Sequence, residues 1–194
     1  MTPQQYFKNV PNTVDMTIRS ELYHTNEFNF AVAVILSAQA TDKKVNEVTP
    51  ELFAVAPTPQ KMLALGIDGL KEHIKVISFF NNKAKNIILC AKRLIDVYDS
   101  QVPDTMEDLL TLPGVGRKIA NLILGDIYGK PAIVSDTHCI RICGRLGFYP
   151  EDIKDPTKVE HIMSAFITLR EQSDFCHRIV LHGRAVCIAR RPKC

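Results

Sequence analysis

The sequence contains no tryptophan, and aromatic residues make up only 7% of its 194 positions. It has no membrane-spanning run, because its most apolar stretch, Phe28 to Ala40, is short and is interrupted by Asn29 and Ser37. The first residues lack a basic segment followed by an apolar one, so no secretory signal is predicted. Low-complexity segments and fixed-period repeats are also missing. Together with 46% hydrophobic and 23% charged residues, these absences exclude membrane-spanning, repeat and disordered proteins.

Charge of one sign is not abundant either, because the formal net charge is only +3. The local distribution is less even, since residues 176–194 hold five basic residues and no acidic one. Such a segment suits backbone phosphates, with a solvated face as the simpler alternative. Six cysteines without a secretory signal indicate thiols or metal ligands in a reducing compartment, not a disulfide scaffold.

The alternation of apolar and polar residues that is typical of strands is nearly absent. Only Ala132 to Val134 is strand-like. Apolar residues recur instead at helical spacing, most clearly over 84–98 and 159–167. The sequence therefore predicts an all-α fold of about ten short helices packed into a compact bundle.

Several residues predict where these helices begin and end. Thr58 and Asp155 each precede a proline suited to the first position of a helix. Asp104, followed by Glu107, is predicted to form a capping box, and Gly66 stands where a helix is expected to stop. These signals divide the chain into short helices with short loops.

The most informative stretch is Leu-Pro-Gly-Val-Gly at 112–116, between two helical patterns over 104–111 and 116–128. Its two glycines permit a tight turn, and Val115 can fill the gap between the helices. Such a turn exposes backbone N–H groups at the start of the second helix, where a phosphate oxygen can bind. The alternative is a tight helical turn without a ligand, which Gly-x-Gly alone would favour.

This stretch resembles the helix-hairpin-helix of DNA-repair proteins, and three further segments narrow the resemblance to the endonuclease III family. Leu36–Asp42 (Leu-Ser-Ala-Gln-Ala-Thr-Asp) looks like that family's N-terminal signature. Ser135–His138 matches its loop ending in an aspartate, and Leu181–Arg184, followed by Cys187, resembles the approach to its iron–sulfur loop. The similarity runs from about Phe28 to the end of the chain.

The resemblance implies a two-lobed helical bundle with the helix-hairpin-helix motif and a DNA cleft between the lobes. Residues 20–130 would form the lobe that carries the hairpin, at 112–118. Residues 1–19 and 131–194 would form the second lobe, which would end in a truncated iron–sulfur loop.

Lys118 and Asp136 are the predicted catalytic pair. A lysine in an exposed helix is usually only solvated, but Lys118 lies in the first turn, where the macrodipole and the neighbouring Arg117 both disfavour a cation. A neutral amine is the nucleophile that a Schiff base requires. Asp136 could be an N-cap alone, yet the resemblance places the family's catalytic aspartate here, as activator or electrostatic stabiliser. A related adenine-specific branch lacks the lysine, so Lys118 favours the lyase branch.

The target base must leave the duplex before an amine can reach C1′ of its sugar. By resemblance, Gln39 is the predicted wedge that fills the gap, with an apolar partner from Phe79 or Phe80. A surface amide and core packing are the respective alternatives. The complete set of predicted DNA-binding residues is Gln39, Phe79, Gly114, Val115, Gly116, Arg117, His138 and Arg184.

Cys187 and Cys194 have the Cys-x6-Cys spacing that, in the resembled family, opens a four-cysteine loop holding a [4Fe–4S] cluster. Four thiolates are the usual ligand set for such a cluster. Only two of the six cysteines, Cys187 and Cys194, stand at the ligand positions that the resemblance implies. The cluster is therefore expected to be absent or incomplete in this chain. Cys139 and Cys143 lie one helical turn apart and are predicted to be core thiols, and Cys90 falls on an apolar stripe.

The predicted function is base-excision repair by a bifunctional DNA glycosylase and AP lyase. It would remove oxidised pyrimidines through a lysine Schiff base and β-elimination. The predicted partner is damaged double-stranded DNA, with no membrane, and the protein is expected to be a cytoplasmic, nucleoid-associated bacterial monomer. Two alternatives stay open, a non-catalytic helix-hairpin-helix DNA-binding protein and a glycosylase for mismatched or alkylated bases.

Overall fold

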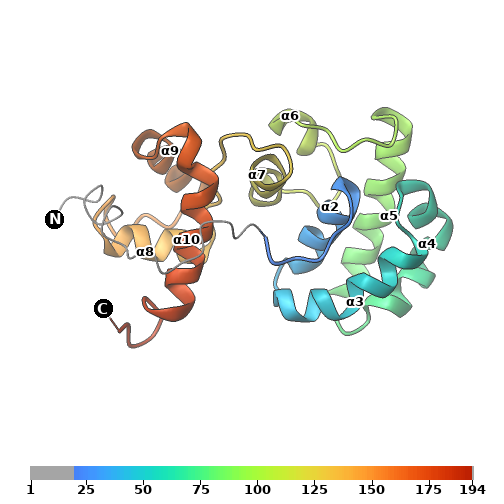
Figure 1. The fold of residues 1–194 in the computed structure, drawn as a ribbon, viewed down its shortest axis with the longest axis horizontal. Coiled ribbons are helices and arrows are strands. Elements are labelled where there is room, and N and C mark those ends of the chain that lie inside the picture. Colours follow the sequence, from blue (N-terminus) through green and yellow to red (C-terminus); the bar gives the residue numbers. More distant parts are fainter. Residues whose placement is uncertain (1–19, 194) are drawn as a thin grey trace. The chain divides into compact units, whose positions relative to one another are not determined.

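The structure, a computed structural model, describes residues 20–193. These residues form two compact units, one of Glu21–Tyr128 and the other of 129–193 (Figure 1). Every regular element in this range is a helix, so the predicted all-α fold is confirmed, and Ala132 to Val134 is not a strand. The sequence-based division, at residue 130, lies two residues beyond this one. The predicted place of residues 1–19 in the second lobe lies outside the described residues.

The unit of residues 21–128 is built around one buried helix. Its elements are α2 (Glu27–Ser37), α3 (Asp42–Val55), α4 (Pro59–Ile74), α5 (Phe80–Val97), α6 (Met106–Leu109) and α7 (Arg117–Asp126). Helix α2 is buried from Phe28 to Leu36, as expected of a helix that is apolar on all sides. It packs against α3, α5 and α7, so these four helices share one core.

Helix α4 begins as the sequence predicts, and it consists of two helical stretches that meet at Gly66. The Thr58 hydroxyl accepts a hydrogen bond from the Lys61 N–H (3.3 Å), which confirms the cap. Gly66 has non-helical backbone, with φ +71° and ψ 173°, so the first helical stretch stops there as predicted. A second helical stretch follows directly after this kink and carries Leu70 and Ile74, both fully buried.

The predicted capping box at Asp104 is displaced by one residue. Thr105 is the N-cap of α6, and its hydroxyl accepts a hydrogen bond from the Asp108 N–H (3.2 Å). Thr105 also donates that hydroxyl to Asp108 Oδ2 (2.7 Å). Threonine and aspartate are both good caps, and this reciprocal pair places the helix start at Thr105.

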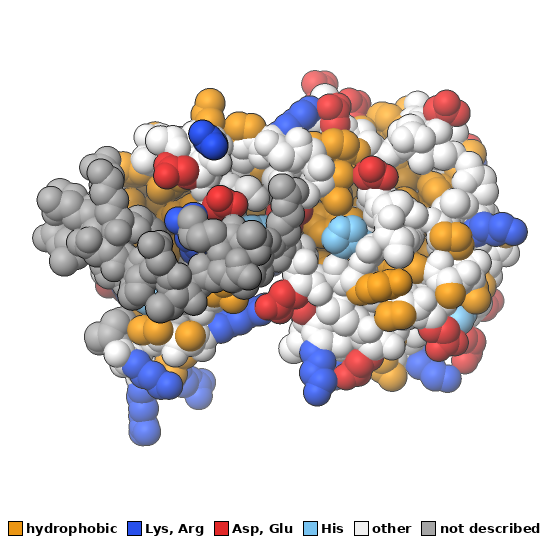
Figure 2. Space-filling view, in the orientation of Figure 1, with side chains coloured by type: hydrophobic (Ala, Val, Ile, Leu, Met, Phe, Trp, Pro, Cys, Tyr) orange, Lys and Arg blue, Asp and Glu red, His pale blue; other side chains and the backbone are white. Residues whose placement is uncertain are grey.

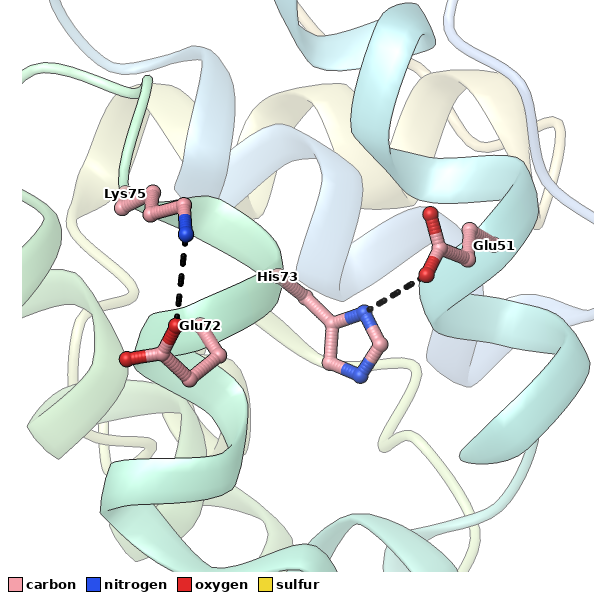
Figure 3. A network of polar contacts seen from close by, with 4 residues as sticks. All are labelled: Glu51, Glu72, His73 and Lys75. Atoms are coloured by element: carbon pink, nitrogen blue, oxygen red, sulfur yellow. Dashed lines mark hydrogen bonds and ion pairs between the residues drawn. The ribbon is translucent and has the colours of Figure 1, made fainter.

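A polar network joins α3 and α4 on the surface of the same unit (Figure 3). His73 Nδ1 lies 3.6 Å from Glu51 Oε1, and Lys75 Nζ lies 3.3 Å from Glu72 Oε2. The carboxylates of both pairs are well exposed, so these contacts add little stability.

The unit of residues 129–193 contains α8 (Thr137–Arg145), α9 (Pro156–Phe166), a 3-10 turn at Leu169–Glu171 and α10 (Gln172–Ala185). Asp155 caps α9 as predicted, because its Oδ1 accepts a hydrogen bond from the Lys158 N–H (2.8 Å). The core of this unit consists of Ile133, Cys139, Ile142, Cys143, Phe148, Tyr149, Val159, Met163, Phe175, Cys176, Ile179 and Cys187. No helix in residues 20–193 is long and apolar enough to span a membrane.

Candidate functional site

The Leu-Pro-Gly-Val-Gly segment forms a tight turn between α6 and α7. The Val115 N–H donates to Leu112 O (3.0 Å), and both side chains are buried. The Ala120 N–H donates to Gly116 O (2.9 Å), which starts α7, and the Ala120 side chain is fully buried. Val115 therefore plugs the hairpin as predicted, and its side chain does not face solvent.

The two glycines of the hairpin have different reasons to be glycine. Gly114 has φ +85°, and a Cβ added there would lie 3.0 Å from Asn86 Cβ of α5. Gly116 has φ −92° and ψ 174°, which any residue can adopt, and an added Cβ would meet no atom within 4 Å. Nothing in this unit requires glycine at 116, so its lack of a side chain is better explained by close approach of an external group.

Gly116 is also the N-cap of α7 and has no side chain with which to accept a hydrogen bond. The first N–H groups of α7 therefore have no side-chain cap from this residue, and they lie where the macrodipole favours an anion. The open space at Gly116 gives a phosphate oxygen access to them.

Lys118 is the second residue of α7 and is exposed. Its ammonium forms no ion pair within residues 21–128, whereas the neighbouring Arg117 is half-buried and takes part in an interaction of its own. Two residues after the turn, the amine can therefore reach a molecule held at the hairpin.

Gln39 lies in the short loop between α2 and α3 and has φ +55°. Left-handed backbone is uncommon for residues other than glycine and costs about 1–2 kcal/mol. The loop is closed by the Ala40 N–H, which donates to Ser37 O (3.0 Å), and Thr41 caps α3. The exposed Gln39 side chain is thus carried on a short, strained turn.

Phe79 is the N-cap of α5, has φ +58° and supplies no side-chain cap. Its aromatic side chain is 63% exposed, whereas Phe80 is half-buried on α5. A bulky residue in left-handed backbone is a genuine outlier, and outliers of this kind concentrate at functional sites. Phe79, and not Phe80, is therefore the aromatic residue available to an external partner.

Asp136 is the N-cap of α8, in the unit of residues 129–193. Its Oδ1 accepts a hydrogen bond from the Cys139 N–H (2.8 Å), which confirms the capping interpretation. This bond fixes the carboxylate on its helix and leaves Oδ2 for another partner. Lys118 belongs to the unit of residues 21–128. The surroundings of Asp136 and Lys118 are therefore described separately, each within its own unit.

The Leu-His-Gly-Arg segment lies on α10, and Gly183 permits close approach to α8. A Cβ at Gly183 would lie 2.3 Å from His138 Nδ1 and 2.9 Å from Ile142 Cδ1. His138 is half-buried and lies 3.1 Å from Arg141 Nη2, whereas Arg184 is exposed. The fold thus brings His138 beside the segment that carries Arg184.

Two arginines of α8 that the sequence analysis did not select anchor the segment after α10. Arg141 Nη2 donates to Cys187 O (2.9 Å). Arg145 donates from Nη1 to Ile188 O (3.0 Å) and from Nη2 to Ala189 O (3.0 Å), and its Nη1 lies 3.3 Å from Cys187 Sγ. No sequence signal marks them, because each acts on carbonyls more than 40 positions away in the chain.

Cys187 is buried, and Cys194 lies outside the described residues. No group of three or more His, Cys, Asp or Glu side chains within residues 20–193 is arranged to hold a metal ion. This part of the chain alone therefore does not fit a four-thiolate cluster. Cys139 and Cys143, with sulfurs 4.0 Å apart, are buried core thiols as predicted, and their hydrogen bond together with burial raises the pKa of Cys139 above its ordinary range.

The end of the described chain is basic. Lys and Arg side chains gather at the lower left of Figure 2, over the C-terminal segment, where Arg190, Arg191 and Lys193 are all exposed. Arg178 is half-buried, 3.9 Å from Asp174. Arg190, Arg191 and Lys193, like Arg184, are therefore accessible to an anionic partner.

Comparison with known proteins identifies relatives over most of the chain. Residues 32–168 match the HhH-GPD superfamily of base excision DNA repair proteins. Endonuclease III of Haemophilus influenzae is 47% identical over 175 residues, which cover 90% of this chain and 82% of that protein. Endonuclease III of Escherichia coli K12 is 43% identical over the same length, with the same coverage of both chains.

Solved structures agree with the sequence relatives. A non-covalent endonuclease III–DNA complex superposes with a TM-score of 0.87 at 40% identity, over 92% of this chain and 83% of that one. A trapped endonuclease III–DNA covalent intermediate gives a TM-score of 0.89 at 38% identity, and the match covers 100% of this chain and 92% of that one. A thermostable thymine-DNA glycosylase shares the fold alone, with a TM-score of 0.82 at 21% identity. That match covers 92% of this chain and 84% of the glycosylase.

Proposed function

The chain belongs to the endonuclease III family of the HhH-GPD superfamily, and on that basis we propose that it is a base-excision-repair DNA glycosylase with AP lyase activity. Its substrate is double-stranded DNA with an oxidised pyrimidine or an abasic site. The observation that carries this proposal is the exposed amine of Lys118, two residues after an open, uncapped helix start.

In this proposal the hairpin holds the DNA backbone. A phosphate oxygen accepts hydrogen bonds from the first N–H groups of α7, at the open space beside Gly116. The buried Val115 side chain supports the turn from inside, so any contact of this residue with DNA is made through its backbone. Arg117, His138, Arg184 and the basic C-terminal segment add contacts to phosphates. The DNA cleft between the lobes stays a prediction from the sequence.

The chemistry follows from an amine and a carboxylate. As the glycosidic bond breaks, positive charge builds on the sugar, and the Asp136 carboxylate stabilises it. The Lys118 amine forms a bond to C1′, and the base leaves with the electrons of the glycosidic bond and takes up a proton. The lysine nitrogen then loses a proton and its lone pair breaks the C1′–O4′ bond, so that O4′ takes up a proton, the sugar ring opens and an iminium forms. The iminium acidifies the C2′ proton, and loss of that proton expels the 3′ phosphate by β-elimination.

The described residues do not complete a four-thiolate ligand set for the cluster expected in the family, and the proposed reaction needs only Lys118 and Asp136. The protein is proposed to act as a monomer on the nucleoid DNA of a bacterial cytoplasm, consistent with bacterial relatives. The non-catalytic alternative is not favoured, because the chain carries Lys118, the nucleophile that the lyase reaction requires.

Borohydride trapping tests the proposal directly. A duplex with one thymine glycol is mixed with the protein and sodium borohydride, beside an undamaged duplex. We expect a covalent band on the damaged strand with wild-type protein and with Lys85→Ala, an exposed-lysine control on α5, and none with Lys118→Ala. Trypsin cannot cut after a modified Lys118, so the adduct should lie on peptide 118–141. A band of wild-type intensity from Lys118→Ala would refute Lys118 as the nucleophile.

A further inference from the structure

Lys83 of α5 is a buried lysine that the reaction does not use. Its side chain is only 7% exposed, and it forms no ion pair with a carboxylate within residues 21–128. Burial lowers the pKa of its amine. Burying an unpaired cation is unfavourable, and Leu or Met would fill the same space more easily. Packing alone therefore does not explain a lysine here.

The Lys83 amine is bonded to the turn that carries Gln39. Nζ donates a hydrogen bond of 2.9 Å to Leu36 O, one of the last carbonyls of α2. A cation is favourable at the C-terminal end of a helix. Two neighbouring carbonyls are satisfied locally, since Ser37 Oγ donates to Val34 O (2.9 Å) and the Ala40 N–H to Ser37 O (3.0 Å). Leu36 O obtains its partner from another helix.

The backbone of the same residue holds the turn that carries Phe79. The Lys83 N–H donates to Phe79 O (3.1 Å) and begins α5. Phe79 and Gln39 both have left-handed backbone and both are exposed. One residue therefore connects two strained turns that lie 40 positions apart in the chain.

We propose that Lys83 is a positioning residue that holds the Gln39 and Phe79 turns in a fixed relation, so that both side chains enter the duplex when the target base leaves it. The inference rests on the proposed function and deepens it, because it assigns the base-extrusion step to a joined pair of turns. Without the amine, the end of α2 can move relative to α5, and Gln39 and Phe79 no longer enter together. Bond breaking at the sugar, which uses Lys118, is left intact.

The test compares a paired and an unpaired lesion under single-turnover conditions. Thymine glycol is placed either opposite adenine or opposite a tetrahydrofuran residue, which leaves no partner base to separate. Lys83→Met keeps the length of the side chain and removes the donor, and Lys85→Met, on the exposed side of α5, is the matched control. We expect Lys83→Met to slow cleavage of the paired duplex by roughly 10-fold to 100-fold and that of the unpaired duplex by less than about 3-fold.

Equal slowing on both duplexes, or no slowing, would overturn the inference. A 2-aminopurine opposite the lesion reports extrusion separately, and its fluorescence rise should be lost in Lys83→Met and kept in Lys85→Met. Should Lys83→Met fail to fold, Lys83→Gln is used, whose amide is too short to reach Leu36 O, with the same expected change in the rate ratio.

Wild-type protein must form the borohydride adduct in the same assay. Failure there would refute the proposed function, whereas an unchanged ratio in an active Lys83 variant refutes this inference.

Discussion

Replacing Gly116 with serine should make the protein more stable and its DNA complex weaker. The site has ordinary extended backbone and room for a Cβ, so the substitution introduces no strain. Serine is a better N-cap than glycine, and it lowers the conformational entropy of the unfolded chain. The two effects together amount to about 0.5–1 kcal/mol. For a protein of this size, the melting temperature should rise by about 1–4 °C.

The effect on DNA binding should have the opposite sign. The serine hydroxyl would accept a hydrogen bond from a first-turn N–H of α7, and its Cβ would occupy the space through which a phosphate approaches. A hydrogen bond to a charged group is worth about 1.5–3 kcal/mol. Its loss corresponds to binding weakened by roughly 10-fold to 150-fold. Fluorescence anisotropy on a duplex with one tetrahydrofuran site, at one fixed salt concentration, measures this change.

Gly114→Ala separates the two roles of glycine in the hairpin. With φ +85° and Asn86 Cβ 3.0 Å from the added methyl, it should lower the free energy of unfolding by about 1–2 kcal/mol. Gly116→Ser and Gly114→Ala should therefore shift the melting temperature in opposite directions. If Gly116→Ser is stable and binds DNA with wild-type affinity, no phosphate is bound at this helix start and the reasoning is refuted.

Three further predictions concern the unit of residues 129–193. Gly183→Ala places a Cβ 2.3 Å from His138 Nδ1, so we expect a loss of about 1–3 kcal/mol. The melting temperature should fall by about 2–12 °C; an unchanged value would contradict the close approach of α10 to α8. Asp136→Asn keeps the cap, so stability should change by less than about 1 kcal/mol while the single-turnover rate falls about 100-fold to 1,000-fold; an equal loss of DNA affinity would favour a purely capping role. Burial lowers the pKa of His182 from 6.5, so below that pH the unfolded state takes up a proton first and stability should fall; urea unfolding at several pH values should show this dependence, and His182→Asn should flatten it.

Local sequence signals predicted most of the helices, but they predicted the residues at which the helices begin and end less accurately. The apolar spacing over 84–98 corresponds to buried positions of α5, and the caps at Thr58 and Asp155 are confirmed. Thr105 displaced the predicted cap because two good capping residues are adjacent, and only the hydrogen bond to Asp108 decides between them. Gly66 interrupts α4 as predicted, but no local signal shows that a second helical stretch, with buried Leu70 and Ile74, follows directly after it.

The site was predictable where a short motif carries it, and not where distant segments meet. Lys83 did carry a signal, because it shares a face with Ile87, Cys90 and Leu94, all of which are buried. A lysine in register with an apolar stripe predicts a buried cation, although not its partner. Leu36 O lies 47 positions earlier, and only the packing of α2 against α5 brings the two together.

Stability alone does not account for the two turns that Lys83 connects. Asp99, Ser100 and Arg191 also have positive φ; Asp99 and Ser100 are short polar residues in a turn, where such backbone is tolerated, and Arg191 lies in the segment after α10. Gln39 and Phe79 are longer side chains that do not favour this backbone, and glycine at either position would relieve about 1–2 kcal/mol of strain. An exposed aromatic ring adds a further unfavourable contact with water. The protein retains strain, exposure and a buried cation in these connected turns, and contact of both side chains with a duplex from which the target base has left would account for all three.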